Sequence, residues 1–292
     1  MRTYLDCLPC FVRQTLEAAR FVTDDETVHA DVLRQVLRAA SEMDMQMAPP
    51  AMGQHIHRLI REATGNADPY REVKQRFNRL ALDLYPDLKR RVAAADDPLE
   101  TAVRLAIAGN IIDFGVSATV SEAAVEETVE RALRDPLVGD VDALRQSVAG
   151  ADRILYLADN AGEIVFDRIL IETLEAPNLA IGVKSVPVIN DATAEDARAA
   201  GLADGPWEIV ENGSDAPGTL LETCSEAFRE RFMAADLVIA KGQGNYETLS
   251  EAPRPVTFVL MAKCPVIAGH LGCEVGSLVL REGAGRRAAP AV

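Results

Sequence analysis

The hydrophobic pattern changes character near residue 150, and this change limits the folds open to the 292-residue chain. Before that point apolar residues recur at helical spacing, as in VHADVLRQVLRAASEM and YREVKQRFNRLALDLYPDLKRRV, and no stretch predicts a strand. Beyond it, short apolar runs alternate with helical segments: Ile154 to Ala158, Leu179 to Val183, Trp207 to Val210, Leu237 to Ala240 and Val256 to Leu260. Such alternation is typical of βαβ units and of a parallel sheet with helices on both faces.

The pattern therefore predicts an α/β protein. We expect a helical region over residues 1–148, followed over residues 149–282 by a three-layer α/β/α domain with a mostly parallel sheet. Residues 283–292 contain Gly, Ala, Pro and Arg without periodicity, so they are predicted to form a flexible tail.

Charge and cysteine content exclude several classes of partner. The formal net charge of −15 disfavours nonspecific binding to nucleic acid and to anionic membranes. No apolar run approaches the roughly 18 residues that cross a bilayer, and the start, MRTYLDCLPC, lacks the features of a signal peptide. Five cysteines without framework spacing fit a reducing compartment. The predicted location is the cytoplasm, and the predicted partner is a small molecule.

Oxygen-bearing side chains follow two of the predicted strands. Asp159 and Asn160 come directly after the first strand, and Asp191 lies shortly after the second. Because the carboxyl ends of parallel strands share one edge of a sheet, we expect these three side chains to converge. Carboxylate and amide oxygens without thiolate or imidazole suit Mg²⁺ or Mn²⁺. This edge is therefore predicted to hold a divalent metal.

Positive charge and glycine follow the strands as well. Lys184 directly follows the second strand, and the segment KGQGN, residues 241–245, follows the fourth. Lys184 and Lys241 would attract an anionic ligand, and Gly242 and Gly244 would let backbone N–H groups approach an oxyanion. A metal, lysines and a glycine-rich loop together indicate phosphoryl chemistry.

Each of these features has a structural alternative. An Asp-Asn pair after a strand is a common turn or helix cap. Asn110 and Asp113 lie at i and i+3 on one helix face, where they would form a buried hydrogen-bonded pair or face a ligand. Glu163 would position a water molecule or simply favour the start of its helix.

Several blocks of the chain occur in the order found in a known family. The segments YLDCLPC, AIAGNIIDFG, LADNAGEIVFDRIL, KSVPVINDAT, AKGQGNYETL and MAKCPVIAGHLG extend from near the start to about residue 280. In these blocks the chain resembles the DUF89 family, the damage-control phosphatase ARMT1-like proteins. The resemblance implies a helical N-terminal part, an α/β/α core, and a metal-dependent phosphatase that hydrolyses sugar phosphates or damaged phosphorylated metabolites.

The resemblance also implies roles for individual residues. Asp159, Asn160 and Asp191 match ligands of a divalent metal, which would be Mn²⁺, Mg²⁺, Co²⁺ or Ni²⁺. Lys241 matches a lysine that contacts phosphate. Other residues fall in blocks that line the family's site: Asn110, Glu163 and Asn245. Cys7 and Cys10 resemble the prokaryotic branch of the family.

Other chemistries remain open at this level. Asp159 would be a covalent nucleophile in an aspartyl-phosphate mechanism, although such enzymes usually carry a second Asp where this chain has Ala161. S-adenosylmethionine-dependent methyl transfer and noncatalytic metal or metabolite binding are further alternatives. Cys7 and Cys10 would form half of a soft metal site or, more simply, a buried reduced pair on a helix. The four histidines show no ligand pattern.

Overall fold

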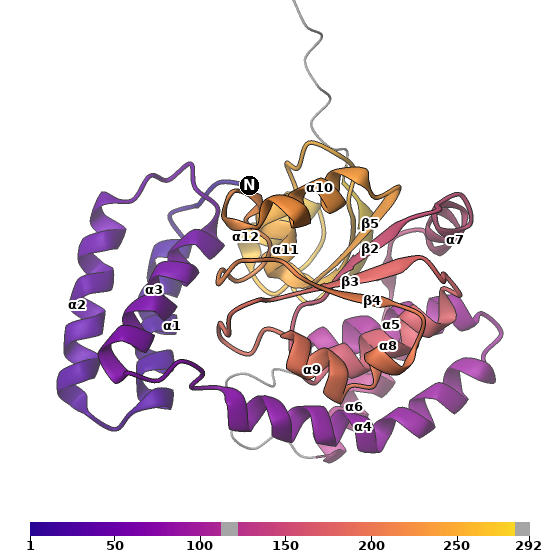
Figure 1. Ribbon diagram of the computed structural model, residues 1–292, viewed down its shortest axis with the longest axis horizontal. Helices are drawn as coiled ribbons and strands as arrows, with labels where there is room; N and C mark the ends of the chain where they lie inside the picture. Colours follow the sequence, from indigo (N-terminus) through magenta and orange to yellow (C-terminus); the bar gives the residue numbers. More distant parts are fainter. Residues whose placement is uncertain (112–121, 284–292) are drawn as a thin grey trace, which may run out of the picture.

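A seven-stranded sheet with the order β1-β7-β6-β5-β2-β3-β4 forms the centre of the computed structural model, which describes residues 1–111 and 122–283 (Figure 1). All neighbouring strands are parallel except β6 and β7. The predicted α/β fold with a mostly parallel sheet is therefore confirmed. The strands are β1 (Leu137–Val138), β2 (Ile154–Leu157), β3 (Leu179–Val183), β4 (Glu208–Glu211), β5 (Leu237–Lys241), β6 (Thr257–Met261) and β7 (Leu278–Glu282).

Two strands were not expected from the sequence. β1 contradicts the prediction that no strand precedes residue 150, because two residues are too few to show any periodicity. β7 has only three buried apolar residues, after which Arg281 and Glu282 are exposed. Both lie on the same side of the sheet, beyond β6, and the five predicted strands form its parallel part.

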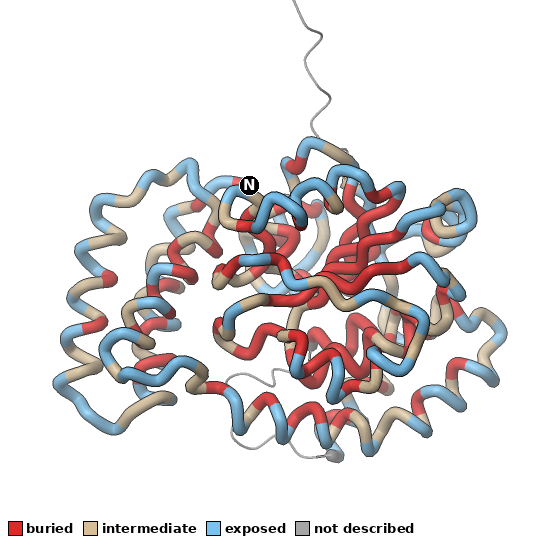
Figure 2. The backbone as a smooth tube through the Cα atoms, viewed as in Figure 1, coloured by how far each residue is buried: buried red, intermediate tan, exposed pale blue. Residues whose placement is uncertain are grey.

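Both faces of the sheet are covered by helices, as Figure 2 shows by the buried strands at the centre. Within β2, Ile154 and Tyr156 face one apolar core while Leu155 and Leu157 face the other, because successive side chains of a strand point to opposite sides. The first core is covered by α4 (Arg71–Ala93), α5 (Pro98–Ile111), α6 (Glu122–Arg134), α7 (Val141–Ala149), α8 (Glu163–Thr173) and α9 (Ala194–Ala199).

The second core is covered by α10 (Glu226–Ala234), α11 (Gly242–Leu249) and α12 (Pro265–Leu271). Two short 3₁₀ turns, Leu202–Asp204 and Leu221–Thr223, complete the connections. Helices that precede residue 148 thus pack on the sheet, and β1 pairs within it. The domain limits proposed from the sequence stay a prediction. Asp113 and residues 284–292 lie outside the described residues.

A bundle of three helices stands beside the sheet: α1 (Cys7–Val22), α2 (Glu26–Glu42) and α3 (Pro49–Thr64) (Figure 1). It has its own apolar core, which includes Phe11, Val32, Val36 and Ile56. We call this unit the helical bundle. Its amphipathic helices bury one face against each other.

Asp215 fastens the helical bundle to the sheet loops. Its carboxylate accepts a bidentate pair of hydrogen bonds from Arg58 of α3, at 2.6 and 2.8 Å, and further bonds from Gln54 and Arg61, each at 2.6 Å. Arg61 also donates to the carbonyl oxygen of Pro187 at 3.0 Å. Partial burial would raise the pKa of Asp215, but the bonds from Arg58 and Gln54 outweigh it and lower the pKa to about 2.

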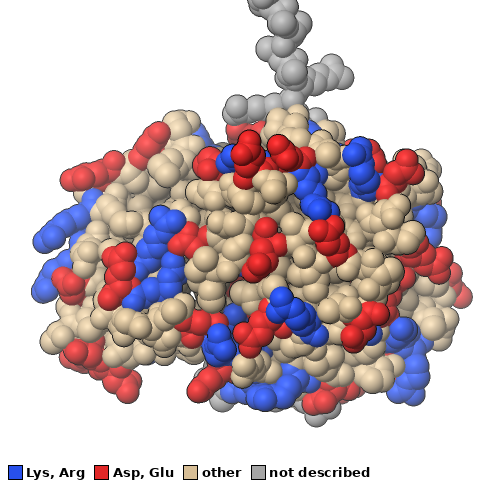
Figure 3. Space-filling view, in the orientation of Figure 1, with Lys and Arg blue, Asp and Glu red and all other residues tan. Residues whose placement is uncertain are grey.

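The surface is charged and mixed in sign. On the face shown in Figure 3, acidic and basic side chains are interspersed over both the helical bundle and the sheet layers. Within residues 1–111 and 122–283, no helix is long and apolar enough to cross a membrane.

We predict that Asp215→Asn lowers the free energy of unfolding at pH 7 by about 1 to 2 kcal/mol, allowing for solvent screening. The stabilisation by Asp215 is present above its unfolded pKa of about 3.9 and is lost as pH falls through the folded pKa of about 2. The difference between wild type and variant should therefore vanish at the acid end of that window.

Urea unfolding measured at several pH values would test this. Asp24→Asn, at an exposed position between α1 and α2, is the matched control and should change stability little at any pH. Equal effects of the two substitutions at pH 7 would contradict the role of Asp215.

Candidate active site

The site lies where the strand order reverses. β2 is flanked by β3 and β5: the chain leaves β2 towards β3 and β4 on one side and returns to β5 on the other. In parallel sheets such a reversal opens a crevice at the carboxyl ends of the strands. The segment Asp159–Asn160 follows β2 at this crevice, and the segment that begins α11 follows β5.

Backbone hydrogen bonds bring Asp191 beside Asp159 and Asn160. The amide of Ala192 donates to the carbonyl oxygen of Asp159, and the amide of Ala161 donates to that of Asn190, both at 2.8 Å. Asn160 and Asp191 thus form an isolated antiparallel bridge. The three predicted metal ligands therefore lie together at the end of β2, although Asp191 is some thirty residues away in the chain.

Glu163 organises the polar side chains around these residues. It begins α8 and is fully buried. Its Oε2 accepts hydrogen bonds from the amide nitrogens of Asn160 at 2.9 Å and Asn110 at 3.1 Å. Asn110 also donates to Asp159 Oδ2 at 2.9 Å. Because the nitrogen of Asn160 points to Glu163, the opposite atom of that amide, its oxygen, is left for a ligand.

Close helix packing places Asn110 within reach of Glu163. Asn110 lies near the end of α5, which packs along α8. A Cβ atom on the preceding Gly109 would meet Phe166 at 3.1 Å and the Cα of Glu163 at 3.3 Å. The glycine therefore allows the two backbones to approach as closely as they do.

Lys241 points into the protein and not into the crevice. Its Nζ is fully buried and donates to Glu163 at 2.6 Å, to Asp167 at 2.5 Å and to the carbonyl oxygen of Ala106 at 2.9 Å. These bonds use all three N–H groups of the ammonium. Burial alone would lower the pKa of Lys241, but the carboxylates of Asp167 and Glu163 outweigh it and raise the pKa. The sequence led us to expect a phosphate contact here, and this arrangement leaves no donor for one.

Lys184 and Asn245 are likewise engaged within the protein. Lys184 donates to the carbonyl oxygen of Gly218 and lies 3.4 Å from Asp191. Asn245 is fully buried, donates to the carbonyl oxygen of Lys241 at 2.8 Å, and accepts from Thr219 at 2.7 Å. Their predicted contacts with substrate stay predictions, and the structure shows both as supports of the loops.

Gly242 is required by the position of Asp159. Its φ is +76°, in the region that favours glycine, and a Cβ atom there would lie 1.7 Å from Asp159 Oδ2. The absence of a side chain thus lets the Asp159 carboxylate sit against the first turn of α11. Asp113, the remaining predicted site residue, lies outside the described residues.

A cavity of about 410 Å³ opens over Asp159, Asn160 and Asp191. One wall comes from the helical bundle and the other from the strand ends and from the starts of α11 and α12. Lys263, which follows β6, is the lysine among the described lining residues, and Arg13 of α1 also lines the cavity. Lys263 is not among the site residues predicted from the sequence, because it lies three residues beyond the predicted strand Val256 to Leu260, whereas Asp159 follows its strand directly.

The acids of the cavity carry more negative charge than the protein neutralises. Burial, with Glu163 and Asp191 nearby, raises the pKa of Asp159, an effect that Lys263 partly offsets. Burial also raises the pKa of Asp191 to about 6 despite Lys184. Asn110 Oδ1 is buried without a hydrogen-bond partner among the described residues, and the buried Asp191 Oδ2 has only the ion pair with Lys184 at 3.4 Å. A cation at this point would compensate both features.

The donors fit a hard divalent metal. Asp159, Asn160 and Asp191 supply oxygen only, as Mg²⁺ and Mn²⁺ prefer. Within the described parts of the chain, no group of three or more His, Cys, Asp or Glu side chains is arranged to hold a metal ion. A metal here would therefore rest on two carboxylates and one amide, with water completing its shell.

Three cysteines line the same cavity. Cys7 and Cys10 lie in the first turns of α1, and Cys264 begins the turn into α12; all three are free thiols. Cys7 and Cys10 lie on a helix, as expected, but they are partly exposed and not buried. Both line the cavity, although Cys7 also packs against the core of the helical bundle.

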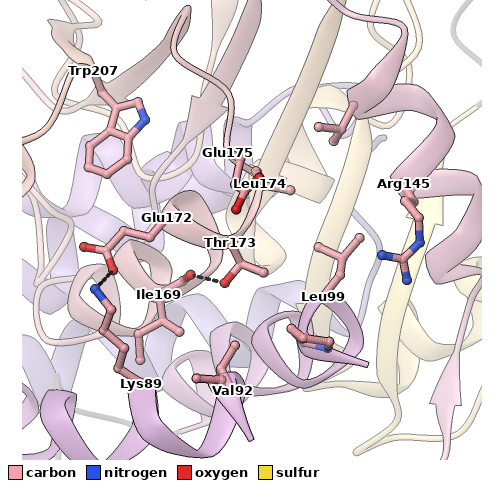
Figure 4. A pocket seen from close by; sticks show the side chains of 13 residues that line it. Lys89, Val92, Leu99, Arg145, Ile169, Glu172, Thr173, Leu174, Glu175 and Trp207 are labelled. Atoms are coloured by element: carbon pink, nitrogen blue, oxygen red, sulfur yellow. Dashed lines mark hydrogen bonds and ion pairs between the residues drawn. The ribbon is translucent and has the colours of Figure 1, made fainter. Parts of the chain in front are cut away.

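A second hollow, of about 550 Å³, lies at the opposite end of α8 (Figure 4). Its floor is apolar, with Val92, Leu99 and Ile169, and its Lys89 is paired with Glu172 at 2.8 Å. The first residue of α8 that lines it, Ile169, lies six residues from Glu163, which is about 9 Å along the helix. It lacks the convergent acids and amides of the first cavity.

Known proteins resemble the chain over nearly its whole length. The family model described as the damage-control phosphatase ARMT1-like domain matches residues 3–279. A damage-control phosphatase of Pyrococcus horikoshii is 36% identical to this chain, and the match covers 96% of this chain and 97% of the Pyrococcus protein. A damage-control phosphatase from Archaeoglobus fulgidus is 34% identical, and the match covers 94% of this chain and 97% of the Archaeoglobus protein.

An uncharacterized protein of Methanocaldococcus jannaschii is 37% identical, and the match covers 94% of this chain and 93% of the Methanocaldococcus protein. A solved structure, a DUF89 family protein from Pyrococcus horikoshii, superposes with a TM-score of 0.88 at 36% identity. The superposition covers 97% of this chain and 99% of that one.

The burial of Lys241 leads to a prediction about stability. Lys241→Met would leave Glu163 and Asp167 as uncompensated buried carboxylates, so it should lower the free energy of unfolding by about 3 to 5 kcal/mol. Lys263→Met, at an exposed position of the same sheet edge, should cost under about 0.5 kcal/mol. Chemical denaturation of the two variants measures the difference, and similar small effects would show that Lys241 does not hold the network.

Proposed function

The chain belongs to the damage-control phosphatase ARMT1-like family and is a phosphatase, and we propose that it hydrolyses phosphate monoesters of small metabolites. In this proposal the reaction uses a divalent metal in the cavity over Asp159, Asn160 and Asp191. The observation that supports the metal dependence is the pair of buried carboxylates, Asp159 and Asp191, both with raised pKa, beside the unpartnered oxygen of Asn110. Sugar phosphates and damaged phosphorylated metabolites are the substrate classes we favour.

Asp159, Asn160 and Asp191 would hold the metal. When bound, a divalent ion neutralises phosphate charge and favours in-line attack by water. The chain contributes orientation: Glu163 fixes the amide of Asn160, and Asn110 fixes the carboxylate of Asp159. Mn²⁺, Mg²⁺, Co²⁺ and Ni²⁺ are the ions to test.

Lys263 and Arg13 are the cationic groups that we assign to the phosphate. Both side chains line the cavity, and Lys263 is close enough to Asp159 to offset part of the rise in that residue's pKa. A compact ammonium facing the phosphate would stabilise its equatorial oxygens as negative charge moves towards the leaving group. We assign Lys241 the supporting role of holding Glu163, in place of the phosphate contact expected from the sequence.

The metal assignment predicts the effect of removing single ligands. Asp159→Ala and Asp191→Ala should each abolish metal-dependent release of phosphate and weaken Mn²⁺ binding, measured by titration calorimetry. Asp6→Ala is the matched control, because Asp6 lines the same cavity outside the proposed ligand set and should leave Mn²⁺ affinity nearly intact. Undiminished Mn²⁺ binding in both ligand variants would remove the proposed site.

Substitution of Lys263 distinguishes a site that binds phosphate from one that binds only a metal. Lys263→Ala should lower kcat/KM for a phosphomonoester by about 10²- to 10³-fold, the usual effect of losing one electrostatic contact to the transition state. Mn²⁺ affinity should survive, because no metal ligand is lost. Lys263→Arg keeps the charge in a larger planar group and should restore activity in part. A loss below about tenfold in Lys263→Ala would assign the phosphate to other residues.

A further inference from the structure

The cavity continues into a side compartment between the helical bundle and α4. Gln14 and Ile189 line both spaces, so the two are contiguous. The compartment measures about 130 Å³, and its walls include Gln14, Ala18, Phe21, His57, Tyr70 and Ile189. We call it the ring subsite, for the reasons that follow.

The walls of the ring subsite are aromatic. Phe21 and Tyr70 stack with ring centroids 4.7 Å apart and planes inclined by 10°. His57 meets Tyr70 edge-on, with centroids 6.1 Å apart at 67°. Phe21 is nevertheless 42% exposed, so one edge of this stack is available to a further flat group.

Two polar rings, His57 and Tyr70, line this compartment and are only 7% and 5% exposed. Their polar atoms are not among the fully buried side-chain atoms that lack a hydrogen-bond partner in the described residues. Those atoms can therefore take a partner from the contents of the compartment. Burial, with Arg61 nearby, lowers the pKa of His57 to about 4 and burial raises the pKa of Tyr70, so both rings are uncharged near neutral pH.

Ile189 links the subsite to the metal ligands. It adopts φ of +45°, a conformation that β-branched residues rarely occupy and that tends to occur at ligand sites. Because Ile189 precedes Asp191 by two residues, their Cα atoms are at most about 7 Å apart. A short spacer would therefore connect a phosphate at Asp191 with a group in the ring subsite.

We propose that the ring subsite binds a planar, uncharged ring carried by the substrate at the end away from its phosphate. This inference rests on the proposed phosphatase function and narrows its substrate class from phosphate monoesters in general to those with such a ring. The aromatic walls favour contact with the faces of such a ring, and the polar atoms of His57 and Tyr70 that line the compartment favour a ring with hydrogen-bonding atoms.

Three probes test the proposal: ethyl phosphate, 2-phenylethyl phosphate, and 2-(pyrimidin-5-yl)ethyl phosphate, whose ring accepts hydrogen bonds and stays uncharged at neutral pH. We expect kcat/KM of the two ring compounds to exceed that of ethyl phosphate by about 30- to 100-fold, from burial of the ring. Equal values for all three, with clear hydrolysis, would overturn the ring subsite and leave the phosphatase function standing.

Variants locate the preference. Phe21→Ala should reduce the ratio of phenylethyl to ethyl phosphate by about tenfold, whereas Leu37→Ala, 47% exposed on α2 of the same bundle, should not change it. Tyr70→Phe keeps the stack with Phe21, so it should lower kcat/KM only for the pyrimidine compound, by about two- to tenfold. An unchanged ratio in Phe21→Ala would contradict the assignment.

Binding distinguishes failure of this inference from failure of the proposed function. If none of the probes is hydrolysed, titration calorimetry with 2-phenylethylphosphonate and ethylphosphonate still reports on the subsite. Tighter binding of the phenyl compound that is lost in Phe21→Ala and in Ala18→Leu, which fills the compartment, would support the ring subsite alone. Equal affinities would overturn it.

Discussion

The fully buried contact between Lys241 and Glu163 is the interaction on which the rest of the site depends. Taking these charges out of water is costly, and only close pairing with further hydrogen bonds compensates for it. Glu163 then has one oxygen left, and both Asn160 and Asn110 donate to that oxygen. The orientation of two amides at the cavity thus follows from one lysine that does not face it.

The fold supplies this network from four separate elements. α5 contributes Asn110, the turn after β2 contributes Asn160, α8 contributes Glu163 and β5 contributes Lys241. They meet because β2 and β5 are neighbours at the reversal of strand order. The opposite wall of the cavity belongs to the helical bundle, and Asp215 holds that wall in place from the sheet side.

The sequence predicted the parallel strands and the convergence of Asp159, Asn160 and Asp191 because both follow from local patterns. β3 was predicted with its observed bounds, and the strand-end rule needs no knowledge of side-chain direction. The direction of Lys241 could not be obtained in this way. The apolar run predicts a strand that ends at Ala240, whereas β5 includes one residue more, Lys241.

The inclusion of Lys241 in β5 fixes the direction of its side chain. Side chains alternate along a strand, so the side chain of Lys241 points to the same face of the sheet as that of Ile239. This face is covered by α5 and α8, and Lys241 pairs there with Glu163 and Asp167. Burial of polar side chains, and the pairing of residues 188–192 with the turn after β2, depend on packing that no local pattern carries. The ring subsite is hidden for the same reason, because its walls come from separate helices.

Anomalous X-ray diffraction from crystals soaked in Mn²⁺ tests the central claim most directly. We expect a strong manganese peak about 2 Å from oxygen atoms of Asp159, Asn160 and Asp191, with the amide nitrogen of Asn160 still turned to Glu163. A manganese peak at the thiols of Cys7, Cys10 and Cys264, or none in the cavity at saturating Mn²⁺, would contradict the account.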